Sequence, residues 1–377
     1  FYGTANTNQM LMEFMGLHLP GASFVNPHTD LREELTIQAT KRALEITALG
    51  NDYTPVSDIL DEKAFVNGLV GLMATGGSTN LVLHLPAMAR AAGVILDLED
   101  FSDISAVTPL MAKVYPNGLA DVNHFHAAGG LQFMIANLLE NGLMHEDVKT
   151  VAGGGMNSYT KEPEISDAGF AYRDGPKTTH NDRILRPASD PFAPQGGLVQ
   201  LNGNIGRGVI KVSAVAPERH IIEAPVRIFH EQHDCKAAFQ AGELTEDTII
   251  VVRFQGPKSN GMPELHSLTP TLAVLQDRGL QVALVTDGRM SGASGKVPAA
   301  IHVAPEAADG GPISLLRDGD ILRLDATNGT LECLTDLTGR SPAVADLSGN
   351  GTGVGRELFE IFRQTVGPST EGAGVVL

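Results

Sequence analysis

The first part of the chain carries apolar residues at helical spacing. They recur with a helical period across 35–49, and Asp30 with Glu33 three positions later resembles an N-terminal capping box with Asp as the cap. Helical signals continue at 64–73 and 87–92. We therefore predict that this part is rich in helices.

The second part of the chain instead carries short apolar runs typical of strands. Two of them, at 248–254 and 281–285, flank a predicted helix that begins with Thr269 as N-cap and Pro270 at its first position and ends at Gly279. Strand, helix and strand in this order predict a βαβ unit with parallel strands. Further strands are predicted at 198–201, at 209–212, and in a hairpin of 321–324 and 331–334 that turns at Asn328–Gly329.

A polar stretch rich in proline and glycine separates these two parts. It shows little periodicity, and we predict that 161–197 is a linker or a long surface loop. The chain then divides into a helix-rich part at 1–160 and a β-rich part at 198–377. Together the two parts predict an α/β protein.

Composition limits the kinds of function that the chain can have. The formal charge of −17, from 27 Lys and Arg against 44 Asp and Glu, argues against nucleic-acid binding. No apolar run approaches the roughly 20 residues of a membrane span, so we expect no membrane association. Two cysteines in 377 residues give no disulfide framework, which favours a reducing, cytoplasmic environment.

The segment 286–298, with the sequence TDGRMSGASGKVP, holds the most distinctive candidate chemistry. It follows a predicted buried strand and mixes three glycines with Arg289, Ser291 and Lys296. Glycine tolerates positive φ, so backbone N–H groups in such a loop can converge on an anion while the cations add charge. A serine in that setting is a candidate nucleophile or base. The spacing excludes a P-loop and a hydrolase elbow, and a glycine-rich turn with solvated Arg and Lys is the alternative.

Glu264 is the second candidate. It lies in the loop after the first strand of the βαβ unit, and Ser291 lies in the loop after the second. Loops that follow parallel strands leave the same edge of the sheet, so the two residues are predicted to be neighbours although 27 positions separate them. A carboxylate there can bind a hard cation beside the serine loop, which suits a carboxylate or polyol substrate. An ordinary loop carboxylate is the alternative.

The third candidate is the segment 76–80, GGSTN, just before an apolar helix. A helix start with free N–H donors suits a carboxylate or a phosphate, and simple helix capping is the alternative. His84 follows one helical turn later and is predicted to face the same site. The polar side chains of this segment belong to Ser78, Thr79 and Asn80.

The two cysteines have unremarkable surroundings in the sequence. Cys333 falls in the predicted hairpin and is interpreted as an ordinary strand residue. Cys235 follows His230 and His233, which would share one face of a helix. A metal site there is one interpretation, and a solvated polar segment is the simpler one.

Four segments carry a resemblance to a known family. In chain order they are FYGTANTNQMLMEFMGLHLPG at Phe1–Gly21, GGSTNLVLHLPAMARAAG at Gly76–Gly93, GPKSNGMPELHSLTP at Gly256–Pro270, and TDGRMSGASGKVPAAIHVAPEA at Thr286–Ala307. On these segments the chain resembles the dihydroxy-acid dehydratase and 6-phosphogluconate dehydratase family. Four long segments in register argue against chance similarity.

The resemblance implies a fold and a set of cofactors. It implies the remainder of a truncated N-terminal dehydratase domain at 1–160, then a β-barrel-like swivelling β/β/α domain at 198–377, with the active site between them. It also implies Mg²⁺ and an iron–sulfur cluster on three cysteines upstream of or bordering Phe1, of the 4Fe–4S type with 2Fe–2S as the alternative. Cys235 and Cys333 match none of these positions, so we expect this chain alone to bind no cluster and to be inactive.

The resemblance also implies a reaction. This is dehydration of 6-phospho-D-gluconate to 2-keto-3-deoxy-6-phosphogluconate in the Entner–Doudoroff pathway, by removal of the C2 proton and Lewis-acid-assisted loss of the C3 hydroxyl. By position, Ser291 matches the family's serine base and Glu264 matches a magnesium ligand. The residues expected to bind the substrate and its phosphate are Ser78, Thr79, Asn80, Lys258, Ser259, Asn260, Arg289 and Lys296.

Other functions stay open at this point. Ser259–Asn260 and Ala293 differ from branched-chain and sugar-acid relatives and favour the phosphogluconate branch. Another dihydroxy-acid or sugar-acid dehydratase of the family is one alternative. A non-catalytic anion-binding or assembly module is the other, because the cluster cysteines are not in this chain. The resemblance further implies a homodimer.

Overall fold

The computed structural model describes residues 3–291 and 295–376, which form two compact units. Unit 1 comprises Phe1–Ser78, Ala92–Val94 and Asp103–Gly197, and unit 2 comprises Thr79–Ala91, Ile95–Ser102 and Leu198–Leu377. The predicted α/β protein, with a helix-rich part and a barrel-like part, is confirmed.

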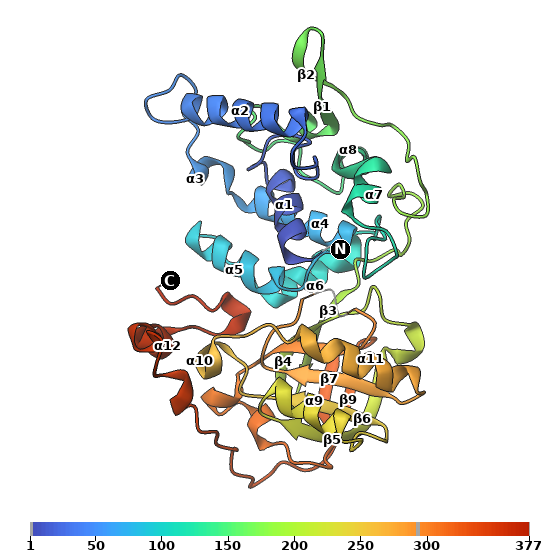
Figure 1. The fold of residues 1–377 in the computed structure, drawn as a ribbon, viewed down its shortest axis with the longest axis vertical. Coiled ribbons are helices and arrows are strands. Elements are labelled where there is room, and N and C mark those ends of the chain that lie inside the picture. Colours follow the sequence, from blue (N-terminus) through green and yellow to red (C-terminus); the bar gives the residue numbers. More distant parts are fainter. Residues whose placement is uncertain (1–2, 292–294, 377) are drawn as a thin grey trace. The chain divides into compact units, whose positions relative to one another are not determined.

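Unit 1 is built mainly of helices (Figure 1). Two of them, α1 and α4, pack closely because α4 carries glycine where they meet: a Cβ at Gly71 would lie 2.5 Å from the ring of Phe14. The core continues through buried residues of α8, among them Phe133. The helices are α1 (Thr4–Phe14), α2 (Asp30–Glu45), α3 (Val56–Ile59), α4 (Glu62–Thr75), α7 (Val122–Ala127) and α8 (Gly130–Glu140).

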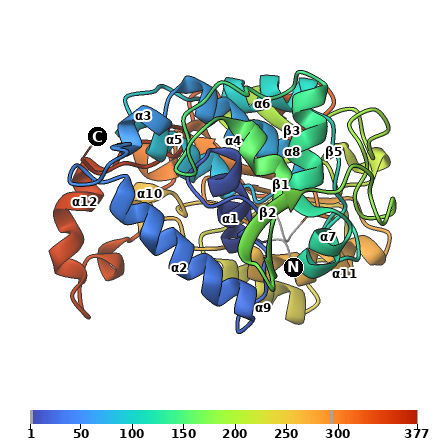
Figure 2. The ribbon, with the colours of Figure 1, turned by 90° about the horizontal axis from the view of Figure 1, so that it is seen from above.

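Two details of unit 1 differ from the sequence prediction. The N-cap of α2 is Thr29, whose hydroxyl accepts a hydrogen bond from the backbone N–H of Arg32 at 3.3 Å, so the prediction of Asp30 was wrong by one residue. The predicted linker contains an antiparallel hairpin of β1 (Lys161–Ser166) and β2 (Gly169–Asp174), which lies beside α2 (Figure 2). Most residues of this hairpin are exposed, so it has no apolar alternation to reveal it.

Unit 2 is organised around a closed barrel of strands in the order β10-β3-β4-β8-β7-β6-β5-β9. The predicted βαβ unit is confirmed, because β6 and β7 are parallel and α11 lies between them in sequence. Thr269 is the first helical residue of α11, and Leu268 is the N-cap, which corrects the predicted cap. The strands are β3 (Leu198–Gly203), β4 (Gly206–Lys211), β5 (Ile221–Phe229), β6 (Thr248–Val252), β7 (Val282–Thr286), β8 (Ala299–Ala304), β9 (Ile321–Asp325) and β10 (Thr330–Cys333).

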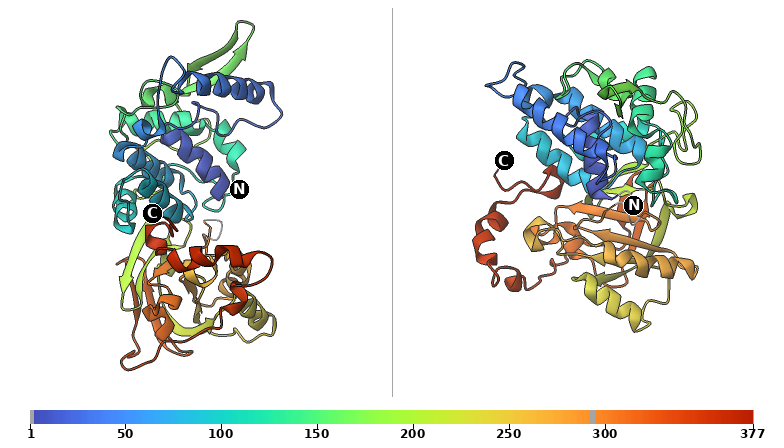
Figure 3. Two further views of the ribbon diagram at one scale, coloured as in Figure 1. Left: turned by 90° about the vertical axis from the view of Figure 1, so that its left-hand side faces the viewer. Right: turned by 45° about the horizontal axis from the view of Figure 1, so that its top comes forward.

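Helices surround the barrel of unit 2. Two of them, α9 and α11, lie against β5 and β7 (Figure 1). The C-terminal segment with α12, red in Figure 3, runs along the outside of the barrel and contacts α10. No helix in the described part of the chain combines the length and the apolar character needed to cross a membrane. The helices are α5 (Leu81–Ala91), α9 (Gln232–Gln240), α10 (Pro257–Asn260), α11 (Thr269–Asp277) and α12 (Glu360–Thr365), and α6 (Leu98–Val107) contains the boundary between the units.

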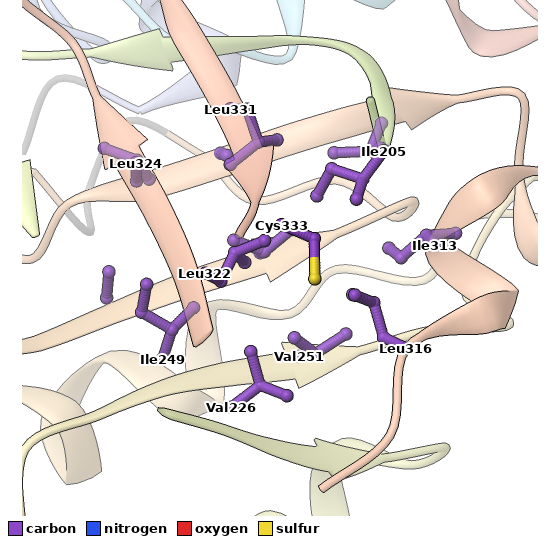
Figure 4. Packing of buried hydrophobic residues seen from close by; sticks show 14 of the residues in the cluster. Ile205, Val226, Ile249, Val251, Ile313, Leu316, Leu322, Leu324, Leu331 and Cys333 are labelled. Carbon is purple, nitrogen blue, oxygen red and sulfur yellow. The ribbon is translucent and has the colours of Figure 1, made fainter. Parts of the chain in front are cut away.

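Apolar side chains fill the interior of the barrel. In β5, buried and exposed residues alternate as expected for a strand with one solvated face, whereas β6 and β7 are buried throughout. Figure 4 shows the sulfur of Cys333 among Leu322, Ile205 and Leu316 in this core. Cys333 is therefore a strand residue that packs in the core, as the sequence indicated.

The barrel closes between β3 and β10 through few contacts. These strands share one backbone pair, Thr330 with Asn202. The side chain of Asn204 reinforces the closure, because its amide donates to the carbonyl of Cys333 at 2.7 Å and accepts from the N–H of Cys333 at 2.8 Å. The side-chain amide of Asn204 thus provides a hydrogen-bond partner for both the N–H and the carbonyl of Cys333, a buried residue of β10.

We expect Asn204→Ala to destabilise unit 2. The substitution leaves the N–H and the carbonyl of Cys333 without these partners, and two such hydrogen bonds contribute about 1–3 kcal/mol. Urea unfolding followed by circular dichroism measures this loss. The matched control is Asn202→Ala, whose side chain is exposed and whose cost should stay within about 0.5 kcal/mol. Equal losses in the two variants would contradict this role of Asn204.

Candidate active site

Glu264 and Ser291 meet at the ends of the two parallel strands, as the sequence predicted. The backbone N–H of Ser291 donates to Oε1 of Glu264 at 2.7 Å. The other carboxylate oxygen, Oε2, accepts from Nη1 of Arg289 at 2.9 Å and from Nδ2 of Asn80 at 3.1 Å. Glu264 therefore joins the loop after β6, the loop after β7 and the start of α5 within unit 2.

Two contacts hold the guanidinium group of Arg289 in place. Its Nε donates to the carbonyl of Met262 at 2.6 Å, and its guanidinium forms an ion pair with Glu264. About a quarter of each partner is exposed, 27% for Arg289 and 24% for Glu264, so the pair is only partly screened by water. The pair joins Arg289 to the carboxylate that accepts the hydrogen bond from the backbone N–H of Ser291.

Asp287, which follows β7 directly, is fully buried and holds the neighbouring segments together. Its carboxylate accepts hydrogen bonds from the N–H groups of Phe254 at 3.1 Å, Gln255 at 2.9 Å and Ala307 at 2.9 Å. Burial raises the pKa of Asp287, and these three N–H groups oppose that shift by stabilising the charged form. The sequence analysis did not single out this residue.

The segment 76–80 is divided between the two units. Ser78 belongs to unit 1, where its N–H donates to the hydroxyl of Thr7 at 3.1 Å. Thr79 and Asn80 belong to unit 2, and the hydroxyl of Thr79 donates to the carbonyl of Met290 at 2.6 Å. Thr79 and Asn80 thus support the serine loop.

The candidate phosphate ligands face different surroundings. Asn260 and Arg289 line a cavity of about 680 Å³ in unit 2. The ammonium group of Lys258 pairs with Asp309, and the hydroxyl of Ser259 donates to Glu306 at 2.8 Å. Lys296 is exposed, and Ala293 lies outside the described residues.

Two arginines that the sequence analysis missed line the same cavity. Arg356 and Arg363 come from the C-terminal segment, and the cavity also borders on Phe359 and Phe362 of that segment. Nη1 of Arg363 donates to the carbonyl of Arg356 at 3.1 Å, which ties the two arginines together. Their positions in the sequence, about 70 residues after the serine loop, gave no signal of this arrangement.

His302 is the second group that the sequence did not reveal. It is fully buried on β8 with φ of 56°, and neither ring nitrogen has a hydrogen-bond partner among residues 3–291 and 295–376. Burial, with Arg289 and His84 nearby, lowers the pKa of His302 to about 3, so the imidazole is neutral at physiological pH. Burial and Arg289 also lower the pKa of His84, which places the predicted histidine near this site. Unpartnered buried polar groups and positive φ at a non-glycine residue are both typical of functional sites.

Both cysteines are buried, Cys235 on α9 and Cys333 on β10. Burial raises the pKa of the Cys235 thiol to about 12. Burial likewise raises the pKa of Cys333. Across residues 3–291 and 295–376, no three His, Cys, Asp or Glu side chains are grouped to bind a metal ion.

The histidines beside Cys235 are also explained by their contacts. His230 lies before α9 and accepts a hydrogen bond from Nε of Arg253 at 3.3 Å, while His233 is an exposed residue of the helix. The expectation that His230 and His233 share one face of a helix was therefore wrong. The polar-segment interpretation accounts for both residues.

The carboxylate of Glu264 has one acceptor position left with which it could coordinate a hard cation. An ionised carboxylate has about four acceptor positions, and the three hydrogen bonds from Ser291, Arg289 and Asn80 leave one of them. The positive charge of Arg289 disfavours a second cation there, so further anionic ligands would be needed to hold it. Among the described residues, Glu264 does not belong to any group of three His, Cys, Asp or Glu side chains that could hold a metal ion.

Comparison with known proteins gives consistent matches along the chain. Residues 1–159 match the sequence profile of the dihydroxy-acid/6-phosphogluconate dehydratase N-terminal domain, and residues 183–373 match the profile of the C-terminal domain. The chain is 58% identical over 380 residues to the phosphogluconate dehydratase of Rhizobium meliloti (strain 1021), which covers 100% of this chain and 63% of that protein.

Two further relatives are similar over the same extent. The phosphogluconate dehydratases of Pseudomonas aeruginosa and Escherichia coli (strain K12) are 59% and 52% identical over 376 residues, covering 99% of this chain and 62% of each relative. The chain thus spans about three-fifths of the length of the curated relatives that it matches.

Proposed function

Because this chain belongs to the dihydroxy-acid/6-phosphogluconate dehydratase family, we propose that it is the major part of a hydro-lyase that dehydrates 6-phospho-D-gluconate to 2-keto-3-deoxy-6-phosphogluconate. The observation that carries this proposal is the match, at 58–59% identity and over 99–100% of the chain, with relatives named phosphogluconate dehydratase. The Glu264–Ser291 contact supplies chemistry that suits this reaction.

In this proposal, Ser291 takes the proton from C2. A serine hydroxyl is a very weak acid, so the alkoxide that acts as the base in this proposal needs positive surroundings, which Arg289 and the N–H groups of the glycine-rich loop are proposed to supply. Glu264 is not the proposed base, because its carboxylate already accepts three hydrogen bonds. The two histidines near Arg289 have lowered pKa values, so they add little positive charge to these surroundings.

The proposed binding of the substrate uses the cavity beside Arg289. Its volume of about 680 Å³ is within the range of small-molecule sites. Arg356 and Arg363 are the proposed partners of the terminal phosphate, because guanidinium groups match phosphate oxygens in pairs. Asn260 and Arg289 are the proposed contacts along the polyol chain.

Cofactors, assembly and location complete the proposal. We propose that Glu264 contributes one ligand to Mg²⁺, which when bound stabilises negative charge on the substrate carboxylate. The iron–sulfur cluster of the family, of 4Fe–4S or 2Fe–2S type, would need ligands other than Cys235 and Cys333. A homodimer in the cytoplasm, acting in the Entner–Doudoroff pathway, is the proposed context.

A substrate panel tests the proposed activity. We expect the full-length protein to dehydrate 6-phosphogluconate with kcat/KM well above the values for dihydroxyisovalerate and unphosphorylated aldonates, because only the first substrate offers a phosphate to the arginines. Formation of the 2-keto acid measures the rate. Preference for dihydroxyisovalerate would instead favour the branched-chain activity of the family, and no turnover of any substrate would favour the anion-binding module.

Ser291→Ala in the full-length protein should abolish removal of the C2 proton. Loss of a general base lowers turnover by about 10² to 10⁴, while substrate affinity and cluster content should stay nearly intact. Exchange of the C2 hydrogen with deuterated solvent reports the step directly. Ser267→Ala, an exposed hydroxyl near the same site, is the matched control and should behave as wild type. If the Ser291→Ala variant exchanges this hydrogen at the wild-type rate, the base is another group.

Glu264→Gln should weaken magnesium binding and lower turnover without affecting the cluster. The amide keeps the shape of the side chain but removes the charge that attracts a cation. The dependence of the rate on Mg²⁺ concentration measures the effect, with the exposed Glu246→Gln as the control. Unchanged magnesium dependence would leave Glu264 solely as the ion-pair partner of Arg289.

A further inference from the structure

The C-terminal segment of unit 2 is held at both ends and exposed in between. We call residues 351–366 the C-terminal strap. It contains η8 (Arg356–Phe359) and α12, and it runs along the outside of the barrel (Figure 3). Residues 352–362 are all exposed. Because the strap buries little apolar surface, packing contributes little to holding it in place.

One end of the strap is anchored on α10. The side-chain amide of Asn350, the residue before the strap, donates to the carbonyl of Ser259 at 3.0 Å. Ser259 is buried, and its own hydroxyl donates to Glu306 at 2.8 Å. The strap therefore begins at a residue that is tied to the loop region after β6.

The other end of the strap is anchored on α5. Gly372 approaches this helix so closely that a Cβ would lie 2.4 Å from the backbone nitrogen of Ala87. The φ of 90° at Gly372 also favours glycine. The preceding residue, Glu371, forms an ion pair with Arg90 of α5 at 2.6 Å. A larger residue at position 372 would have to move this anchor away from α5.

Left-handed backbone conformations occur near both ends of the strap. Gly353, Val354 and Gly355 have φ of 80°, 53° and 80°, and Gly372 and Ala373 have φ of 90° and 50°. A positive φ is strained for a β-branched residue such as Val354. Strained backbone is typical of clamps and switch segments, and hinges consist of a few loop residues. These two groups of residues are therefore candidate hinges.

The strap presents two guanidinium groups to the cavity of about 680 Å³. Nη1 of Arg356 donates to the carbonyl of Thr352 at 3.2 Å, and Nη1 of Arg363 donates to the carbonyl of Arg356 at 3.1 Å. A guanidinium has five N–H donors. Within the described part of the chain, each arginine thus keeps donors with which it can bind an anion.

The charged residues that line this cavity favour an anion. In the part of the chain that the structure describes, the cations are Arg289, Arg356 and Arg363, and the acidic residue is Glu231. Arg289 is already paired with a carboxylate, so the strap supplies the cations that are not in an ion pair among the described residues. Glu357 lies close to both strap arginines in sequence, but it lines a neighbouring cavity.

Two aromatic rings of the strap also line the cavity. Phe359 and Phe362 lie with their ring centroids 5.9 Å apart. The rings are far from buried, because Phe359 is 54% exposed and Phe362 is 40% exposed. An inward movement of the strap would remove part of this apolar surface from water, which is favourable.

We propose that the C-terminal strap is a lid that closes over the cavity when Arg356 and Arg363 bind the phosphate of the substrate, turning at 353–355 and 372–373. The inference rests on the proposed dehydratase function and deepens it, because it names the element that selects a phosphorylated substrate. Charge-assisted hydrogen bonds from two guanidinium groups draw the strap inward. An unphosphorylated sugar acid lacks this attraction and leaves the strap open.

Hydrogen exchange in the full-length protein tests closure without requiring turnover. We expect 6-phosphogluconate to slow amide exchange in 351–366 about tenfold, because opening becomes rarer when the lid is held down. Gluconate should leave this exchange unchanged even in large excess. Residues 321–333, the β9–β10 hairpin, are the internal control and should respond to neither ligand. Equal protection by both ligands, or none by 6-phosphogluconate, would refute the lid.

Gly372→Ala in the full-length protein tests the anchor on α5. We expect KM for 6-phosphogluconate to rise about tenfold with kcat nearly unchanged, because displacing the anchor weakens binding of the phosphate. The kcat/KM for gluconate should stay at the wild-type value. Gly319→Ala is the matched control: its φ of 86° gives similar backbone strain, but among the described residues no atom lies within 4 Å of the added Cβ.

The outcomes separate the lid from a static wall and from the dehydratase function. If Gly372→Ala lowers kcat/KM equally for both substrates, the anchor only shapes the cavity and the lid proposal fails. If this variant does not fold, exchange in the wild-type protein decides. Turnover of 6-phosphogluconate without protection of the strap would refute the lid and leave the dehydratase function standing. If no substrate is turned over, that function fails, whereas protection by 6-phosphogluconate would still support a lid that binds a phosphorylated ligand.

Discussion

The buried carboxylate of Asp287 is the constraint on which the candidate site depends. It accepts hydrogen bonds from backbone N–H groups after β6, from Phe254 and Gln255, and after β8, from Ala307. Removing an ion from water costs several kcal/mol, and only such saturated hydrogen bonding offsets that cost. Because Asp287 directly follows β7, these bonds fix the direction in which the loop carrying Ser291 leaves the barrel.

The ion pair of Glu264 and Arg289 then sets the electrostatics of the site. Glu264 holds the backbone of Ser291 and neutralises much of the charge of Arg289. Arg289 in turn adds to the effect of burial on His84 and His302, whose pKa values are lowered. The result is a site with one ion pair and two neutral imidazoles.

The proposed roles of this chain's own residues can therefore be tested separately from the roles of the proposed cofactors. Glu264 has one acceptor position left for a cation, and both cysteines are buried. The residues proposed to bind the substrate and to move the C2 proton, Asn260, Arg289, Arg356, Arg363 and Ser291, all belong to unit 2. Substitutions in these residues can be assessed by proton exchange and titration, independently of the departure of the hydroxyl group.

The sequence by itself determined the local elements and one important contact. Apolar runs and turn residues predicted β6, α11 and β7, and parallel pairing was enough to place Glu264 beside Ser291. Tertiary structure alone decided the burial of Lys211, Asp287 and His302, because the cost of burying a polar group depends on partners from distant segments that no local pattern encodes. For the same reason the arginines of the C-terminal segment could not be assigned to the cavity beside Arg289 before the chain was folded.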